Sequence, residues 1–423
     1  MAPTPGLRAR PAGRTAALGA AAALALLLAL RGPGLYPDSA SYLAGAPYRP
    51  PLYPAFLDVA HLLGGRLALR LVVFLLALLG GLSLLWCVDR LRRVLALPRL
   101  AALLLLVALA VGQLRFAGDI VSEALAAPLY LCFLTALIEA VVGGERGPLL
   151  WAVAWLVLGV LARPQLMFAW PVLLLAAGAW LSRGPPRRPG RASLALAIAG
   201  MVLCGWLAQH AANLARHGRW DGIHFTGLQL LTPAVYLADR QDLALFTDPE
   251  EHRYLATVFA DLEARHLFAW SRPPRYSQSA FFADAYNDIC HEVIEREFKP
   301  AAPAGALTID EWAVLDRLTL GIARRLLARH PARFLGHVAG QAYGYEKSLA
   351  LLVAGLAALA LLFARRQPRF RALLVVVALW LSNVALVCAI EAPMARYFIY
   401  TDGPLVGLVL ALLVGAAPPP EDA

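Results

Sequence analysis

Long apolar stretches fill both ends of the chain, whereas the stretch between them mixes apolar and polar residues at helical spacing. An apolar run of about 20 residues can cross the hydrocarbon core of a bilayer as a helix. The pattern predicts ten spans, at residues 15–31, 67–88, 95–113, 121–142, 149–162, 165–181, 192–213, 348–364, 372–390 and 404–417. The fifth and sixth are short and meet at Arg163-Pro164, where proline favours a break in the helix. We interpret these two as separate tilted or re-entrant helices.

Arginine clusters between the spans predict how the helices are oriented. Lys and Arg are enriched in short cytoplasmic loops, and three clusters lie near residues 90–99, 183–191 and 365–371. With the N-terminus inside, ten spans place all three clusters in the cytoplasm. The first span follows several arginines, as in a signal peptide, but no small-residue cleavage pattern follows it, so an uncleaved helix is expected. We therefore expect a multi-pass protein of the inner (plasma) membrane with both termini cytoplasmic.

This topology divides the chain into three parts. Residues 1–213 form the N-terminal transmembrane helices and include a first outer loop at 32–66, and residues 348–423 form the C-terminal transmembrane helices. Residues 214–347 lack strand alternation and carry helical apolar spacing between proline-rich breaks, which predicts a mostly helical extracytoplasmic domain. The fold class expected is an all-α polytopic membrane protein.

Composition supports the membrane class and excludes several others. The chain is 60% hydrophobic and only 16% charged, against about 25% charged in a typical soluble protein. This excludes an ordinary cytosolic enzyme, a disordered chain and a nucleic-acid-binding domain. The net charge is +10, yet residues 214–345 hold 14 basic and 16 acidic residues, so the excess lies between the spans, where it reflects topology. The five cysteines form no CxxC pair, so neither a disulfide framework nor a zinc site is expected.

Acids, arginines and tyrosines gather at four of the predicted outer turns. Ionisable groups at a membrane edge are costly, so such a set indicates a site. The candidate residues are Asp38, Tyr42, Arg49, Tyr53, Arg115, Asp119, Glu123, Arg163, Arg396 and Tyr397. Arginine binds phosphate oxygens through a bidentate fork, and a carboxylate beside an acceptor hydroxyl can take its proton. The set suits transfer from a phosphate-linked lipid, whose phosphate leaves already ionised, so that no general acid is required.

Four short elements at these turns resemble the landmarks of a known superfamily. They are Asp38-Ser39-x-x-Tyr42 followed by Arg49-Pro50-Pro51-Leu52-Tyr53-Pro54, then Asp119…Ser122-Glu123, Ala162-Arg163-Pro164 and Arg396-Tyr397…Pro404-Leu405. Their order and common side resemble the GT-C membrane glycosyltransferases, in the branch of the protein O-mannosyltransferases and the bacterial aminoarabinose lipid A transferases. The resemblance covers the transmembrane parts at both ends and does not extend to residues 214–347.

The resemblance implies a GT-C-like bundle and an enzyme that moves a sugar from a polyprenyl-phosphate donor to an extracytoplasmic lipid, glycan or protein acceptor. It places a catalytic acid at Asp38, which would act as the general base of an inverting transfer, while several of the arginines hold the donor phosphate. Ser39 follows Asp38 where some members carry a second acid. A metal-independent mechanism without a cofactor is therefore expected, and a divalent metal remains the alternative.

Each candidate residue also has a structural interpretation. Asp38 could cap a helix that starts near Ser39. Asp119 and Glu123 are four residues apart, so on one helix they would share a face and either bind substrate or pair with Arg115. The other arginines could be interfacial anchors, and the tyrosines could belong to an aromatic belt.

Two other functions remain open beside glycosyl transfer. One is a transporter or flippase of lipid-linked sugars, although such proteins place charges near the bilayer midplane and often show paired halves, which this chain does not. The other is a polysaccharide polymerase or ligase, which would lack the Asp38-to-Tyr53 opening. The sequence contains no Walker A, GxGxxG, HExxH or GxSxG motif, so nucleotide-sugar chemistry on a Rossmann scaffold has no support.

Overall fold

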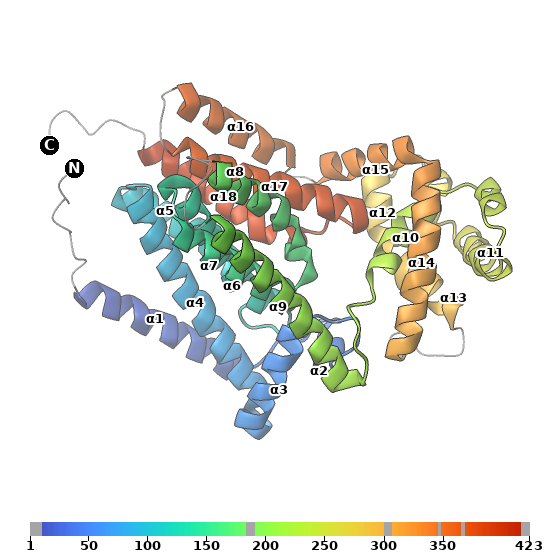
Figure 1. The fold of residues 1–423 in the computed structure, drawn as a ribbon, viewed down its shortest axis with the longest axis horizontal. Coiled ribbons are helices and arrows are strands. Elements are labelled where there is room, and N and C mark those ends of the chain that lie inside the picture. Colours follow the sequence, from blue (N-terminus) through green and yellow to red (C-terminus); the bar gives the residue numbers. More distant parts are fainter. Residues whose placement is uncertain (1–10, 183–190, 300–306, 346–347, 365–368, 416–423) are drawn as a thin grey trace.

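The computed structural model describes residues 11–182, 191–299, 307–345, 348–364 and 369–415. Within these ranges the chain forms helices and no strand, apart from an isolated bridge between Gly34 and Asp119. The predicted all-α class is confirmed. The helices form an elongated transmembrane bundle with a second helical unit at one end (Figure 1).

The bundle contains α1 (Pro11–Arg31), α4 (Ala68–Val94), α5 (Arg99–Leu114), α6 (Glu123–Gly143), α7 (Arg146–Ala162), α8 (Trp170–Ser182), α9 (Arg191–His217), α16 (Ser348–Ala364), α17 (Phe370–Ile390) and α18 (Ala395–Gly415). Two further helices, α2 (Ser39–Leu43) and α3 (Leu52–Gly64), lie between α1 and α4. The outer unit contains α10 (Thr226–Tyr236), α11 (Pro249–Ala264), α12 (Gln278–Asn287), α13 (Arg296–Phe298), α14 (Ile309–Arg329) and α15 (Pro331–Gly344). Short 3-10 or π segments are η1 (Gly65–Leu67), η2 (Pro164–Ala169), η3 (Arg240–Leu245), η4 (Ala269–Ser271) and η5 (Asp288–Glu295).

Six helical stretches of the described chain are long and apolar enough to cross a membrane. They are Leu52–Val94, Glu123–Gly143, Pro164–Ser182, Ala192–His217, Phe370–Ile390 and Ala395–Gly415. Four shorter apolar helices are Thr15–Arg31, Arg99–Leu114, Arg146–Ala162 and Ala350–Phe363. Each of the ten predicted spans therefore has a helical counterpart.

The first outer segment differs from the expected loop because it contains α2 and α3. Pro51 is the N-cap of α3, consistent with the preference of proline for helix starts. The helix ends at Gly64, since Gly65 takes a φ of 50° that other residues rarely adopt. A short 3-10 turn then leads directly into α4, so the apolar run of α4 extends back to Leu52.

The predicted break between the fifth and sixth spans is present. Helix α7 ends at Ala162, and Arg163 takes an extended conformation with φ −155° and ψ 113°. Pro164 has no N–H to continue the helical ladder, and a 3-10 turn precedes α8 instead. After this break the Arg163 side chain lies at the N-terminal end of α6, where it forms an ion pair with Glu123.

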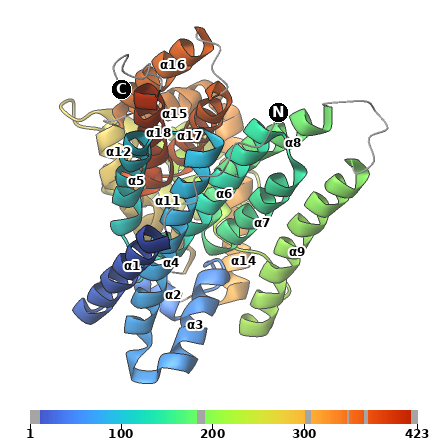
Figure 2. The same cartoon turned by 90° about the vertical axis from the view of Figure 1, so that its left-hand side faces the viewer.

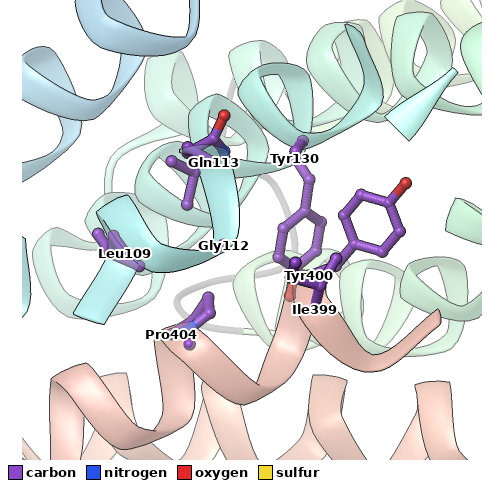
Figure 3. Close-up of a pocket in the computed structure, with 10 residues that line it drawn as sticks. Leu109, Gly112, Gln113, Tyr130, Ile399, Tyr400 and Pro404 are labelled. Carbon is purple, nitrogen blue, oxygen red and sulfur yellow. The ribbon is translucent and has the colours of Figure 1, made fainter. Parts of the chain in front are cut away.

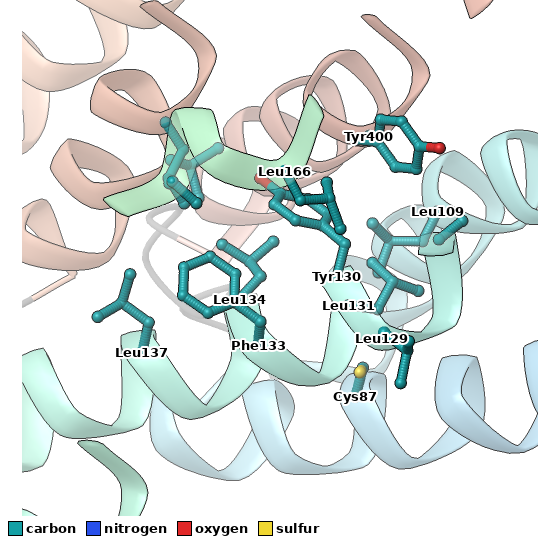
Figure 4. Close-up of a cluster of buried hydrophobic side chains, with 14 of the residues drawn as sticks. Cys87, Leu109, Leu129, Tyr130, Leu131, Phe133, Leu134, Leu137, Leu166 and Tyr400 are labelled. Carbon is teal, nitrogen blue, oxygen red and sulfur yellow. The ribbon is translucent and has the colours of Figure 1, made fainter. Parts of the chain in front are cut away.

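Two hydrophobic cores stabilise the two parts of the molecule. The first is centred on α6, which is the most deeply buried of the apolar spans and contacts α4 and α7 along its length. Its Leu and Phe side chains interleave with those of neighbouring helices (Figure 4). The second core lies among α10 to α14, from Leu228 to Leu326, and also includes Ala392, which follows α17. Helix α9 stands at the edge of the bundle and is almost entirely unburied, as a lipid-facing helix would be (Figure 2).

Turns that the sequence predicts to be cytoplasmic lie together at one end of the bundle. Arg369 donates to the carbonyl oxygens of Gly415 at 2.9 Å and Ala96 at 3.0 Å, which joins the ends of α17, α18 and the α4–α5 turn. Arg90 forms a bidentate pair with Glu139 near the same turn. Most of the arginine cluster at 183–191 and residues 365–366 lie outside the described residues. The opposite end carries the outer unit and the candidate site.

Candidate functional site

Asp38 stands at the start of α2, and arginines contact both of its carboxylate oxygens. Arg49 Nη2 lies 2.7 Å from Oδ1, and Arg396 Nη1 lies 3.1 Å from Oδ2. Asp38 is the N-cap residue by position, but its backbone is helical and its side chain makes no capping hydrogen bond. The capping interpretation of this carboxylate is therefore wrong. The two arginines come from opposite ends of the chain and meet only in the folded protein.

Arg49 is held from several directions. Its Nε donates to Ser41 Oγ at 2.8 Å, and its Nη1 donates to the Tyr42 hydroxyl at 3.3 Å. The guanidinium carbon lies 4.4 Å from the ring centre of Tyr42 and 5.1 Å from that of Tyr48. Planar guanidinium groups combine ring stacking with directed hydrogen bonds in this way. Arg49 lies close to α2 because the chain turns after this helix, and in that turn the Arg49 N–H donates to the Ala46 carbonyl oxygen.

A second ion pair lies deeper, at the start of α6. Arg163 Nη1 is 2.8 Å from Glu123 Oε2, and both side chains are nearly excluded from solvent. The same Nη1 donates to Ser122 Oγ at 2.9 Å, and Ser122 Oγ is 2.8 Å from the Tyr42 hydroxyl. A continuous polar network therefore runs from Asp38 through Arg49, Tyr42 and Ser122 to the buried pair. Buried charges persist in proteins when they are paired and hydrogen-bonded.

Tyr397 joins the third arginine to this network. Arg396 Nη2 donates to the Tyr397 hydroxyl at 3.0 Å, and the guanidinium of Arg163 lies 5.5 Å from the Tyr397 ring centre. Tyr53 packs edge-on against Tyr42 at 5.1 Å. Tyr42, Tyr53 and Tyr397 are all buried inside the protein, so the aromatic-belt interpretation does not describe them.

Several buried polar atoms around Asp38 have no hydrogen-bond partner within the described chain. They are Tyr53 Oη, Glu123 Oε1, Glu391 Oε2, Arg396 Nε and Tyr400 Oη. Buried polar atoms are rarely left without a partner, and a cluster of them at one place is typical of a ligand site. Donors and acceptors are both present, as a sugar or phosphate ligand requires.

The site holds two carboxyl groups whose pKa values move in opposite directions. For Asp38, burial alone would raise the pKa, but Arg49, Arg396 and more distant Arg163 outweigh it and hold the pKa below its ordinary value. For Glu391, at the C-terminal cap of α17, burial raises the pKa despite the nearby arginines. Gln229 Nε2 donates to Glu391 Oε1 at 2.6 Å. Asp38 is thus the ionised acid of the pair and Glu391 the acid that protonates more easily.

A pocket opens beside the network, between α5, α6 and α18. Its lining is mostly apolar and includes Leu109, Gly112, Tyr130, Tyr400 and Pro404 (Figure 3). Tyr400 lies one turn of α18 beyond Tyr397, and it interacts electrostatically with Arg163 and Glu123. The pocket therefore adjoins the charged network on the side of the apolar helices.

Two predicted site residues lie outside this network. Asp119 sits in the turn before α6, where Gly34 pairs with the backbone on either side of it. Because α6 begins only at Glu123, the prediction that Asp119 and Glu123 share a helix face is wrong. Arg115 is exposed, and its guanidinium lies 5.5 Å from the Phe116 ring centre. It is not among the arginines that act on Asp38.

Other residues of the network were not predicted as site residues. Ser122 lies within a recognised element, but a single serine carries little signal. Glu391 is an acid at a predicted outer turn, which fits a structural role as well as a functional one. Gln229 belongs to the outer unit, and no local pattern marks it, because its partner is distant in sequence.

The chain was compared with known protein families, curated proteins and solved structures. No family model matches the chain, and no curated protein matches it. The crystal structure of ArnT from Cupriavidus metallidurans bound to undecaprenyl phosphate is similar, with 15% sequence identity and a TM-score of 0.37. The match covers 96% of this chain and 78% of that chain.

Proposed function

We propose that this protein is a GT-C-type membrane glycosyltransferase that moves a sugar from a polyprenyl-phosphate donor to an extracytoplasmic acceptor. The observation that carries the proposal is the arginine pair on Asp38, in which Arg49 and Arg396 flank one carboxylate beside an apolar pocket. A lipid phosphate needs cationic groups for its oxygens and an apolar surface for its chain. The acceptor can be a lipid, a glycan or a protein.

The arginines are suited to bind the donor phosphate. Arg49 and Arg396 present N–H groups at the bundle end, and Arg163 lies behind them with its charge partly balanced by Glu123. Guanidinium groups bind phosphate oxygens with two parallel hydrogen bonds and keep their charge at any physiological pH. The pocket lined by Tyr130 and Tyr400 has room for about one water molecule. The first isoprene units would therefore lie along exposed apolar side chains of α5 such as Val111 and Leu114.

Asp38 would act as the general base. Its lowered pKa keeps the carboxylate ionised, so that it can accept the proton of an acceptor hydroxyl. The hydroxyl oxygen then attacks the anomeric carbon, the bond from that carbon to the phosphate oxygen breaks, and the lipid phosphate leaves as an anion. Attack from the face opposite the leaving group inverts the anomeric configuration.

Donor binding would also strengthen the base. Without the donor, Asp38 is a weak base because Arg49 and Arg396 stabilise its negative charge. A phosphate that attracts the same two arginines removes part of this stabilisation and raises the basicity of Asp38. The arginines already supply positive charge at the carboxylate, which supports a mechanism that uses no metal.

The arrangement of the helices supports an extracytoplasmic site. The arginine-rich turns at Ala96 and Arg369 lie at one end of the bundle, and Asp38 lies at the other with the outer unit. Short arginine-rich turns face the cytoplasm in inner-membrane proteins. We therefore propose a bacterial inner-membrane enzyme with its active site on the outer face.

Reconstituted protein tests this function directly. Purified protein in lipid nanodiscs is incubated with a panel of undecaprenyl-phosphate monosaccharides and an envelope extract, and products are followed by mass spectrometry. The proposal predicts release of undecaprenyl phosphate together with a sugar-bearing product. Movement of the donor across a vesicle membrane without any covalent product would instead indicate a transporter or flippase. Growth of a long repeating glycan would indicate a polymerase or ligase.

A further inference from the structure

The outer unit contacts the segment that carries the first arginine. Tyr48, immediately before Arg49, stacks on Phe225 with ring centres 5.6 Å apart and planes inclined at 25°. Its ring also lies 4.7 Å from that of Trp312, which is only 1% exposed. Since Trp312 belongs to the second core, Tyr48 is anchored to the outer unit rather than to the bundle.

The outer unit also contacts the segment that carries the second arginine. The connection between α17 and α18 leads to Arg396. The Tyr286 hydroxyl donates to the carbonyl oxygen of Ile390, the last residue of α17, over 3.3 Å. Gln229 Nε2 binds Glu391 one residue later at 2.6 Å. Ala392 is 1% exposed and belongs to the second core. The approach to Arg396 is therefore packed into the outer unit as well.

Both anchors meet at the start of α10. Phe225 is the N-cap of α10, and Gln229 lies on its first turns. This end is fixed to α14, because the Gly227 N–H donates to Asp316 Oδ1 at 2.6 Å. A Cβ at Gly227 would lie only 2.7 Å from the Leu320 backbone nitrogen, so the two helices approach closely. A displacement of this end of α10 would therefore move the anchors of both arginines together.

We propose that the start of α10 positions the arginine pair of the active site, with Tyr48 as the positioning residue for Arg49 and Gln229, through Glu391, as the positioning residue for Arg396. The proposal rests on the proposed function, in which these arginines bind the donor phosphate. It makes the outer unit part of the catalytic apparatus rather than only a cover over it. An acceptor that binds the outer unit would thereby influence how the donor phosphate is held.

Chemical modification of arginine tests this coupling without any need for enzymatic turnover. The full-length protein in nanodiscs is treated with phenylglyoxal, and modification of Arg49 and Arg396 is followed by peptide mass spectrometry. We expect Tyr48→Ala to speed modification of Arg49 by roughly 2- to 12-fold, the range that corresponds to the coupling of one aromatic pair. Tyr48→Phe keeps the stacked ring and should restore wild-type protection. Gln229→Met should expose Arg396 in the same way.

Kinetics and a matched control complete the test. Tyr343 is an aromatic residue of the outer unit that is 78% exposed, so Tyr343→Ala should leave both rates unchanged. With a competent donor, Tyr48→Ala should lower kcat by about 10- to 100-fold through misplacement of Arg49, and Tyr48→Phe should recover it. Unchanged modification rates in folded Tyr48→Ala and Gln229→Met would overturn the coupling. If Tyr48→Ala does not fold, Gln229→Met alone decides. If the two variants show faster arginine modification while the wild-type protein transfers no sugar, the coupling stands and the proposed function alone is refuted.

Discussion

Replacing Asp38 with asparagine separates the two roles that we propose for this residue, general base and partner of the two arginines. Asparagine keeps the size of the side chain but can neither accept a proton as a base nor form ion pairs with Arg49 and Arg396. The variant should therefore lose transfer activity. It should also bind undecaprenyl phosphate more tightly, because a phosphate no longer competes with the carboxylate for the two arginines.

The magnitudes follow from the geometry. A positioned general base contributes about 10²- to 10⁴-fold to the rate, and kcat should fall by that factor. The two ion pairs, at 2.7 and 3.1 Å, join side chains that are 20–28% exposed. Pairs exposed to this degree are worth up to about 1 kcal/mol each. Their loss should tighten phosphate binding by up to roughly 30-fold, since 1.4 kcal/mol corresponds to a factor of ten.

Two assays on the same preparation measure these effects. Sugar transfer is followed by mass spectrometry, and the Kd for undecaprenyl phosphate is measured by native mass spectrometry of the purified protein. Asp284→Asn is the matched control, because Asp284 is an exposed acid of α12 in the outer unit, and it should change neither quantity. Full transfer by Asp38→Asn would refute the general-base role. Weaker phosphate binding would show that Asp38 holds the arginines in place rather than competing for them.

Three further predictions concern the Arg163–Glu123 pair, Arg115 and the pH dependence of activity. Arg163→Met should destabilise the protein by about 3–5 kcal/mol in thermal unfolding, because Glu123 is left buried without its cation, and a Glu123→Gln change in the same chain should recover part of the loss. Arg115→Ala should leave transfer and phosphate binding within twofold of wild type, since Arg115 is exposed and is not among the arginines that act on Asp38; a large loss would place a substrate contact there. Because Arg49, Arg396 and Arg163 hold the pKa of Asp38 below its ordinary value, kcat/KM should show no acid limb from this group between pH 5 and 8, and activity should fall only below about pH 4. An acid limb near pH 6 in the pH–rate profile would contradict this assignment.

The sequence predicts the features that depend on local composition. Apolar length indicates where the spans lie, and Pro164 indicates the break that positions Arg163. The cost of charge at a membrane edge points to Asp38, Arg49 and Arg396 as members of one site. The spans and the break are present in the structure because each follows from the composition of a short stretch of chain. The three side chains are in contact, and their role in a site stays a prediction.

Features that depend on long-range pairing are not predictable in this way. The sequence predicts that Asp119 lies on a helix. In the structure, the backbone of Gly34 pairs with the residues on either side of Asp119, and α6 begins only at Glu123. The bond between Gln229 and Glu391 joins residues that are 162 positions apart, and neither residue has a local pattern that names its partner. The sequence likewise does not show that Tyr48 packs against the second core, since one aromatic residue beside Arg49 fits either a membrane belt or a packed interface.

A structure of the protein with bound undecaprenyl phosphate, determined by electron cryo-microscopy, would show where the donor phosphate binds. We expect the phosphate to lie within hydrogen-bond distance of Arg49 and Arg396, the first isoprene units to lie along α5, and the Asp38 carboxylate to be released from at least one arginine. A phosphate bound elsewhere, with both arginines still paired to Asp38, would contradict this expectation.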